Sequence, residues 1–295
     1  FDVMKFKENW TNLENIKNPP TRVNKIFTED FDKFKNEIIK EKEVFVKKIT
    51  KSLYEGDIYI LKNAFSENFF NDLKTKNYEN FKDVPSSFHK MKQDCPDFHR
   101  QIDLDSGKKY SFKVCKHSFY FYHWNNDPLN IFPEIYEKWR VIKKLMGLDM
   151  FAYEKNKPLD GVIDRIQVVR YPSKFGHLEP HSDPYRYQRL FLSGYMSKKN
   201  NDYNDGGFYV IDKDDKVIDA EKFIDVGDIG IGYATIIHGV APVNIKKDPD
   251  WNDINDGRWF LSMYSNESDE VKNRHTAHAI GDKIKIIDKS IFPPE

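Results

Sequence analysis

Short runs of apolar residues, several of them alternating with polar ones, follow one another along the chain from about residue 160 onward. Turn residues such as Asn204, Asp205, Gly206 and Gly207 stand between the runs. The predicted strands are residues 165–171, 177–183, 189–197, 207–212, 229–237 and 258–265. Many short strands at fairly even spacing are typical of a barrel or a jelly roll. We therefore expect a β-rich core over about residues 160–266.

The chain before residue 160 shows helical patterns as well as strands. Residues 1–56 are polar and rich in lysine, and Phe31, Phe34 and Ile38 recur at helical spacing. Further elements are expected as strands at 57–65 and 117–124 and as helices after Ser66 and at about 132–147. The pattern predicts an α+β protein with a mainly β core, divided into a helical N-terminal extension (1–56) and a single larger domain (57–295).

Composition narrows the partners and the compartment. Lys+Arg and Asp+Glu balance at 47 each, so no net charge favours a nucleic acid or an anionic membrane surface. Cys95 and Cys115 are too few for a disulfide framework or a zinc cluster, which favours a reducing compartment. No apolar run approaches the roughly 20 residues of a membrane span, and FDVMKFKENW does not look like a signal peptide. We expect a cytoplasmic protein without a nucleic-acid or membrane partner.

The stretch HLEPHSD (177–183) carries four possible metal ligands at alternate positions, His177, Glu179, His181 and Asp183. In a regular extended chain all four would point to the same side. One histidine and one carboxylate bind a divalent metal ion weakly, so a third ligand is needed from elsewhere. His238 can supply it, at the end of the apolar run IGIGYATII.

Two histidines and one carboxylate form the facial triad of non-haem Fe(II) oxygenases, which leaves adjacent coordination positions open for a bidentate cosubstrate and O₂. A structural zinc site would instead close its shell, usually with cysteine. A keto-acid cosubstrate also needs a partner for its distal carboxylate. Arg258 opens a predicted strand and has the fork geometry for two parallel hydrogen bonds. Tyr171 ends an earlier strand and could donate to the same carboxylate.

Taken in order, these motifs resemble the Fe(II)/2-oxoglutarate-dependent dioxygenases, and within them the prolyl-4-hydroxylase-like branch. The matching segments are VVRYPSKFGHLEPHSD, LSGYMSKKNNDYNDGGFYVI, VGDIGIGYATIIHGVAPVN and GRWFLSMYS, which together cover roughly residues 160–266. An isolated HxD pair is common by chance, whereas the ordered set is specific. The resemblance implies a double-stranded β-helix of the jelly-roll or cupin kind, supported by N-terminal helices, and makes 57–295 a catalytic domain.

The resemblance also selects among the possible ligands, because it places a proline directly before the metal-binding histidine and Pro180 precedes His181. It implies that His181, Asp183 and His238 bind Fe(II). His177 and Glu179 would then line the pocket or orient the bound histidines. 2-Oxoglutarate would chelate the iron, with Arg258 and Tyr171 at its far carboxylate. The implied activity is hydroxylation of an unactivated C–H bond in a small molecule or peptide, with succinate and CO₂ as coproducts.

The chain departs from the branch in two ways. His238 and Arg258 are 20 positions apart (258 − 238), which is longer than is typical of the branch. An inserted polar surface loop, KKDPDWNDIND (246–256), would account for the difference. The anchor is also Arg where the branch usually has Lys. By spacing alone Lys246 or Lys247 is a rival anchor, but Gly257-Arg258-Trp259 matches the start of the strand, which favours Arg258.

Other interpretations stay open on the sequence. One is a jelly-roll protein that binds a ligand without turnover, and another is a metal-dependent hydrolase or isomerase of the cupin type. Several side chains near the predicted site could serve either packing or binding. They are Arg170, Arg186 and Arg189, expected on a solvated face or at an anionic substrate, Tyr195, expected in the core or at the cosubstrate, and His117 and His123, on a strand face that could orient a ligand.

Overall fold

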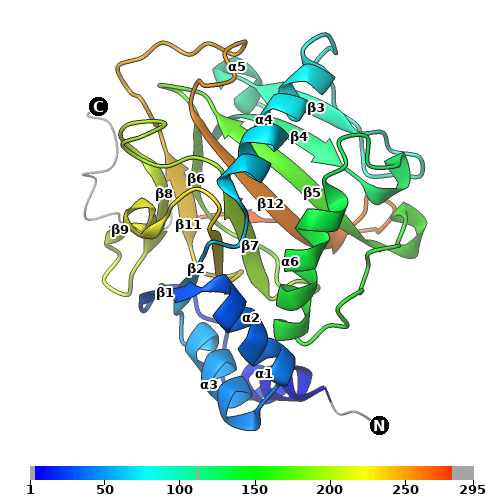
Figure 1. Ribbon diagram of the computed structural model, residues 1–295, viewed down its shortest axis with the longest axis vertical. Helices are drawn as coiled ribbons and strands as arrows, with labels where there is room; N and C mark the ends of the chain where they lie inside the picture. The colour runs from blue at the N-terminus through cyan, green and yellow to red at the C-terminus, as the bar shows by residue number, and fades with distance from the viewer. Residues whose placement is uncertain (1–3, 111–112, 281–295) are drawn as a thin grey trace.

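The computed structural model describes residues 4–110 and 113–280, and its centre is a pair of facing β-sheets (Figure 1). Eight strands follow one another along the chain, β5 (Val162–Tyr171), β6 (His177–Ser182), β7 (Leu190–Tyr195), β8 (Gly207–Ile211), β9 (Val217–Asp219), β10 (Ile229–Tyr233), β11 (His238–Ala241) and β12 (Arg258–Glu267). One sheet has the order β10-β7-β12-β5, and the other has the order β6-β11-β8-β9. Apart from β8 and β9, which form a hairpin in one sheet, successive strands thus switch between the sheets in the manner of a double-stranded β-helix. The predicted fold class is confirmed.

The remaining elements extend and cover this core. The helices are α1 (Lys5–Ile16), α2 (Phe31–Lys40), α3 (Glu43–Tyr54), α4 (Glu67–Phe81), α5 (Leu104–Gly107) and α6 (Phe132–Leu145). The added strands are β1 (Ile26–Asp30), β2 (Ile58–Lys62), β3 (Phe98–Ile102), β4 (Val114–Phe121) and β13 (His278–Ala279). None of the helices in the described ranges is long and apolar enough to cross a membrane.

The N-terminal segment contributes a strand as well as helices. Figure 1 shows α1, α2 and α3 together at one end of the molecule. β1 pairs in parallel with β2, which continues the β10 edge of the core sheet. Trp10 on α1 is fully buried and donates from its indole nitrogen to the carbonyl of Leu145 at 2.7 Å. Apolar residues of this segment therefore share one core with the β-strands. The domain division at residue 56 stays a prediction.

Alternation along the strands decides which side chains face the space between the sheets. On β12 the odd residues Trp259 and Leu261 belong to the apolar core that also contains Trp139 of α6, while the even residues line a cavity between the sheets. β5 pairs with β12 along its whole length, so its odd residues line the same cavity. One sheet thus separates a helix-covered apolar core from an internal cavity.

Several predicted elements differ in the structure. The run 229–237 is not one strand, because residues 234–237 form a turn between β10 and β11. His238 therefore begins β11 rather than ending the preceding strand. The helix predicted after Ser66 is α4 and continues to Phe81, and Ser66 caps it by accepting from the backbone N–H of Phe69 at 3.0 Å. Residues 80–112, which have no clear pattern in the sequence, contribute β3 and α5.

Candidate metal centre and the cavity around it

A bulge in β6 determines which residues of HLEPHSD face the cavity. His238 of β11 lies opposite His181 of β6, and Val240 lies opposite Leu178. Two steps on β11 therefore match three steps on β6, so β6 carries one extra residue. Leu178 and His181 both line the cavity as a result, although regular alternation would place them on opposite faces. The prediction that all four possible ligands point the same way is wrong.

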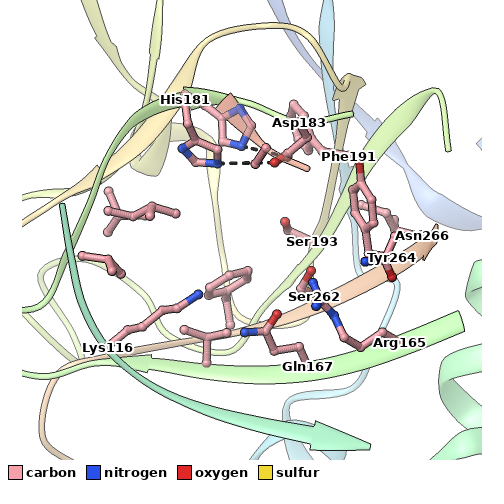
Figure 2. Close-up of a pocket in the computed structure, with 18 of the residues that line it drawn as sticks. Lys116, Arg165, Gln167, His181, Asp183, Phe191, Ser193, Ser262, Tyr264 and Asn266 are labelled. Atoms are coloured by element: carbon pink, nitrogen blue, oxygen red, sulfur yellow. Dashed lines mark ion pairs between the residues drawn. The ribbon is translucent and has the colours of Figure 1, made fainter. Parts of the chain in front are cut away.

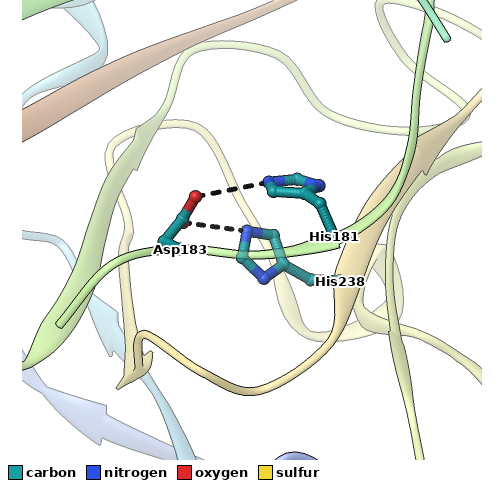
Figure 3. Close-up of side chains that lie close together, drawn as sticks. All are labelled: His181, Asp183 and His238. Carbon is teal, nitrogen blue, oxygen red and sulfur yellow. Dashed lines mark ion pairs between the residues drawn. The ribbon is translucent and has the colours of Figure 1, made fainter. Parts of the chain in front are cut away.

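The structure brings His181, Asp183 and His238 together (Figure 3). One possible ligand atom from each lies within 4.8 Å of the other two. Nε2 of His181 is 3.5 Å from one carboxylate oxygen of Asp183, and Nε2 of His238 is 3.3 Å from the other. The backbone N–H of Asp183 donates to the carbonyl of Ala234 at 2.9 Å, so the turn before β11 holds the carboxylate beside both rings. Three side chains from two strands and a loop thus converge on one point.

Backbone hydrogen bonds orient both imidazole rings. Nδ1 of His181 lies 2.9 Å from the carbonyl of Glu179, and Nδ1 of His238 lies 2.8 Å from the carbonyl of Ile236. A carbonyl can only accept, so each Nδ1 carries the proton and each Nε2 can present a lone pair to a metal ion. Both Nε2 atoms point toward Asp183. The donor set therefore fits a divalent cation that accepts imidazole and carboxylate ligands.

The charges at this centre also suit a cation. Burial lowers the pKa of His181 to about 4, and the neighbouring His238 adds to the effect, so His181 is neutral near pH 7. Burial opposes ionisation of Asp183, but the hydrogen bond from His238 and the charges of both histidines hold the pKa of this carboxyl below its usual value. Burial likewise opposes a charge on His238, yet its hydrogen bond to Asp183 raises the pKa of this imidazole. A buried carboxylate with a proton shared from a histidine is a site where a metal ion can replace that proton.

His177 and Glu179 lie beside the centre but do not line the cavity, so the predicted pocket-lining role is wrong. Nδ1 of His177 lies 2.8 Å from the carbonyl of Phe175. The carboxylate of Glu179 accepts from the backbone N–H of Lys113 at 2.7 Å. Glu179 does help to orient His181, but through its backbone carbonyl. Its side chain takes no part in that contact.

The cavity has a volume of about 330 Å³ and extends along the paired strands β5 and β12 (Figure 2). Pairs of facing residues mark its length, Arg258 with Tyr171, Phe260 with Val169, Ser262 with Gln167 and Tyr264 with Arg165. Six residues separate Arg258 from Tyr264 (264 − 258), which is about 20 Å of strand. The cavity therefore has two well-separated ends, which we call the Arg258 end and the Arg165 end.

A buried ion pair forms the Arg258 end. Arg258 is only 2% exposed, and its Nε donates to the carboxylate of Glu221 at 2.6 Å. Burial opposes the charge on Arg258, but the Glu221 carboxylate holds the pKa of the guanidinium above its usual value. This bond engages Nε and leaves the two terminal nitrogens of the guanidinium for a ligand. Glu221 also accepts from the backbone N–H of Phe208 at 2.8 Å, which fixes the carboxylate.

The sequence gives one signal that could have identified Glu221, the paired glycines of the turn before β8. Gly207 has a φ of +96°, and a Cβ atom there would lie 2.6 Å from the carboxylate of Glu221. A glycine is required both by the backbone and by the close approach of this side chain. The glycine at position 207 therefore leaves the space in which the Glu221 carboxylate lies beside Arg258.

Two tyrosines accompany Arg258. Tyr171 is directly opposite it on β5, lines the cavity and stacks on Phe260 with ring centroids 5.9 Å apart. Tyr195 of β7 also lines the cavity, and the Arg258 guanidinium lies 5.8 Å from its ring. The Tyr195 hydroxyl is buried and has no hydrogen-bond partner among residues 4–110 and 113–280. A guanidinium, a tyrosine hydroxyl and an unsatisfied buried hydroxyl together suit a carboxylate.

The rival anchor lysines lie outside the cavity. Lys247 pairs with Asp256 at 2.9 Å, and neither Lys246 nor Lys247 lines the cavity. Residues 246–256 form an irregular loop as predicted. A residue of β5, Arg170, binds this loop through hydrogen bonds. Arg170 is buried and donates to the carbonyls of Trp251 at 2.6 Å and Asp253 at 2.7 Å. Arg170 therefore serves the loop and neither faces solvent nor reaches the cavity.

The remaining candidates have structural partners. On β4 the even-numbered face, with Lys116 and Tyr120, lines the cavity, and His117 points to the opposite face. There His117 contacts His99 at 2.8 Å and Arg170 at 3.2 Å. Nε2 of His123 lies 2.6 Å from the carbonyl of Asn156. Neither histidine lines this cavity, so of the two interpretations of this strand, packing and ligand orientation, the structure supports packing.

Arg189 and Arg186, the other arginines near the predicted site, differ in their exposure and partners. Arg189 pairs with Glu14 of α1 at 2.5 Å and ties the N-terminal segment to the core. Arg186 is exposed, as predicted for a solvated face. Neither of them lines the cavity between the sheets, but both line a second cavity that also borders Asp183.

Comparison with known proteins adds similar folds and no family assignment. No protein-family model and no curated protein matches the chain. A full-length Neurospora crassa protein, crystallised in complex with alpha-KG and thymine, is 12% identical over 87% of this chain and 94% of that chain, with a TM-score of 0.46. JOX2 in complex with 2OG, Fe and JA is 13% identical over 90% and 85%, with a TM-score of 0.49. A Pseudomonas putida prolyl-4-hydroxylase is 10% identical over 70% and 91%, with a TM-score of 0.40. At these values the likeness concerns the course of the chain and not the chemistry of its site.

Proposed function

We propose that this chain is a non-haem Fe(II)/2-oxoglutarate-dependent oxygenase that hydroxylates an unactivated C–H bond of a small molecule or peptide. The observation that carries the proposal is the convergence of ligand atoms from His181, Asp183 and His238 within 4.8 Å, at the wall of an internal cavity. The same cavity contains a buried guanidinium, that of Arg258. A metal site and a carboxylate site in one cavity are the two requirements of this reaction class.

His181, Asp183 and His238 would hold the iron through two neutral imidazoles and one carboxylate, the facial arrangement typical of non-haem Fe(II) oxygenases. When bound there, Fe(II) with 2-oxoglutarate and O₂ supplies the oxidation of a C–H bond, with succinate and CO₂ as coproducts. The carbonyls of Glu179 and Ile236 keep each Nδ1 protonated and each Nε2 directed at the metal position.

The Arg258 end would bind the far carboxylate of 2-oxoglutarate. Nε of Arg258 is occupied by Glu221, so the guanidinium stays in one orientation and offers its terminal nitrogens to the carboxylate. Tyr171 can donate a further hydrogen bond from the opposite strand. The apolar side chains Val169, Leu178 and Val240 line the cavity between the two sites and exclude water from the bound cosubstrate.

The test is an anaerobic titration with Fe(II) and 2-oxoglutarate, followed by a succinate assay in air. We expect a weak visible charge-transfer band in the absence of oxygen and succinate after its admission. His181→Ala should abolish both signals, whereas the matched control His177→Ala should retain both, because His177 lies outside the cavity. Without a band and without succinate, the two alternatives from the sequence, a ligand-binding jelly roll and a cupin-type hydrolase or isomerase, would replace this proposal.

A further inference from the structure

Two further cationic side chains face the cavity, Lys116 at the strand position beside Tyr171 and Arg165 at the other end. Lys116 projects from the cavity-facing side of β4, and Arg165 lies on β5 opposite Tyr264. Figure 2 shows Lys116, Gln167 and Arg165 along one wall, across the open space from His181 and Asp183. We call these two cations with Gln167 the Lys116–Arg165 wall.

Neither cation of this wall has an acidic partner among the described residues. The Lys116 side chain makes no hydrogen bond or ion pair within residues 4–110 and 113–280, although it is half-buried. Nε of Arg165 is buried without a partner in the same part of the chain, and its Nη1 only reaches the sulfur of Met91 at 4.0 Å. Burial lowers the pKa of Lys116; the charges of Arg165 and Arg100 add to this, while Tyr120 and the more distant Asp183 act in the opposite direction. Side chains of this kind are normally paired when they leave bulk water.

The charge of the whole cavity lining has the same sign. Asp183 is the only acidic residue among the described lining residues, and it belongs to the candidate metal centre. The basic lining residues are Arg100, Lys116, Arg165, Arg258 and Arg274. Of these, Arg258 pairs with Glu221 and Arg274 with Asp269, at 3.2 Å. Lys116, Arg165 and Arg100 therefore leave an excess of positive charge in the cavity lining.

Aromatic side chains surround this excess charge. Tyr120 and Tyr264 line the cavity beside Arg165, whose guanidinium lies 5.6 Å from the Tyr120 ring. The Arg100 guanidinium stacks on Tyr110 at 4.6 Å, on the same side of the cavity. Rings next to cations provide an apolar surface for the body of a ligand and leave the charges for its anionic group.

We propose that the substrate is a small organic anion with a carboxylate or phosphate group, and that Lys116 and Arg165 bind this group. Its apolar or aromatic body then lies against Tyr120 and Tyr264, between the wall and the metal centre. The proposal rests on the proposed function, since it assigns the remaining space of the same cavity to the substrate. Lys116 and Arg165 are specificity-determining residues in this arrangement.

Ligand binding to the protein loaded with Mn(II) and 2-oxoglutarate, without oxygen, tests the proposal. The probes are hexanoate, 3-phenylpropanoate and indole-3-acetate, each beside its primary amide, and phenyl phosphate as a second kind of anion. Affinity is measured from the rise in melting temperature with probe concentration. We expect acids to bind and the matched amides not to. Phenyl phosphate binding more tightly than every carboxylate would support the site and assign it to phosphate esters.

Variants connect the result to the two cations. Lys116→Met and Arg165→Met should each weaken binding of the acids by about ten- to a hundredfold, the usual effect of losing a charged hydrogen-bond partner. Lys116→Arg should retain most of the affinity. Lys213→Met makes the same chemical change at an exposed position outside the cavity and should have no effect.

Three results would overturn the proposal. They are equal binding of acids and amides, no binding of any probe while 2-oxoglutarate still binds, and loss of 2-oxoglutarate affinity in Lys116→Met, which would assign Lys116 to the cosubstrate. Failure of the proposed function looks different, because Mn(II) and 2-oxoglutarate themselves would not bind. Acid binding that still depends on Lys116 in such a protein would leave the anion site standing alone.

Discussion

The two ends of the cavity both present positive charge, but the protein satisfies that charge in only one of them. At the Arg258 end the guanidinium is buried against Glu221, at 2.6 Å. Along the Lys116–Arg165 wall, which runs from the strand position of Tyr171 to the Arg165 end, neither cation forms an ion pair with an acidic side chain among the described residues. The first cation keeps one orientation whether or not a ligand is bound. Lys116 and Arg165 can gain an anionic partner from a bound ligand. These two residues are therefore better suited than Arg258 to discriminate between substrates.

A third buried cation extends this comparison. Arg170 lies on the other face of the same strand as Arg165. Its two terminal nitrogens contact neutral groups, the carbonyls of Trp251 and Asp253 and a nitrogen of His117, while its Nε has no partner among the described residues. Its role is to hold the 246–256 loop against the sheet. A buried arginine is therefore not a binding-site signal by itself, and its partners decide its role.

The largest effect is expected from breaking the pair at the Arg258 end. Arg258→Met leaves Glu221 as a buried, unpaired carboxylate, so the free energy of unfolding should fall by about 3–5 kcal/mol. Affinity for 2-oxoglutarate should be lost as well. Urea unfolding and the anaerobic titration measure the two effects. The double variant Arg258→Met with Glu221→Leu should recover stability but not 2-oxoglutarate binding; recovery of both would show that Arg258 is not the anchor.

A pH-dependent effect on stability is expected from His117, which contacts Arg170. Burial lowers the pKa of His117 to about 2, with the charge of Arg170 adding to the shift, so the folded state keeps this imidazole neutral. The unfolded chain takes up a proton near pH 6.5, and stability is lost as the pH falls below that value, by up to about 1.4 kcal/mol per pH unit. His117→Gln should make the slope of stability against pH between 6 and 4 shallower by about one proton. An unchanged slope in urea unfolding would contradict this interpretation.

A smaller change in stability is expected from removing Lys116, and its sign should be opposite to that of Arg258→Met. Lys116→Met removes a half-buried cation that has no acidic partner among the described residues, so the free energy of unfolding without ligands should stay the same or rise by about 1 kcal/mol. Arg258→Met and Lys116→Met thus differ in sign, although both remove one positive charge from the same cavity. A clear loss of stability in Lys116→Met would show that Lys116 has a structural role.

The smallest effect on the cosubstrate is expected at the rival anchor. Lys247→Met should change the affinity for 2-oxoglutarate by less than about twofold, since Lys247 is outside the cavity and pairs with Asp256. The same anaerobic titration measures it beside Arg258→Met. A loss of affinity as large as that of Arg258→Met would move the anchor into the loop.

Much of the fold could be predicted from residue patterns. Alternation and turn residues located most strands of the core, and the cap at Ser66 was correct because it is a local interaction. The strand 229–237 was wrong at its end, where apolar residues continue through a turn. β3 and β9 gave no clear pattern, because their pairing with β4 and β8 supplies the stabilisation that their own residues lack.

The sequence by itself determined the sheet-forming core and the three residues that converge at the candidate metal centre, His181, Asp183 and His238. Only the tertiary structure decided how they are presented. The bulge in β6 turns His177 and Glu179 away, because one extra residue reverses the alternation of the strand. Glu221 came to Arg258, and Lys116 and Arg165 came to line one cavity, through the pairing of segments far apart in the chain. Such contacts leave no local spacing in the sequence, since burial and charge pairing depend on which strands become neighbours.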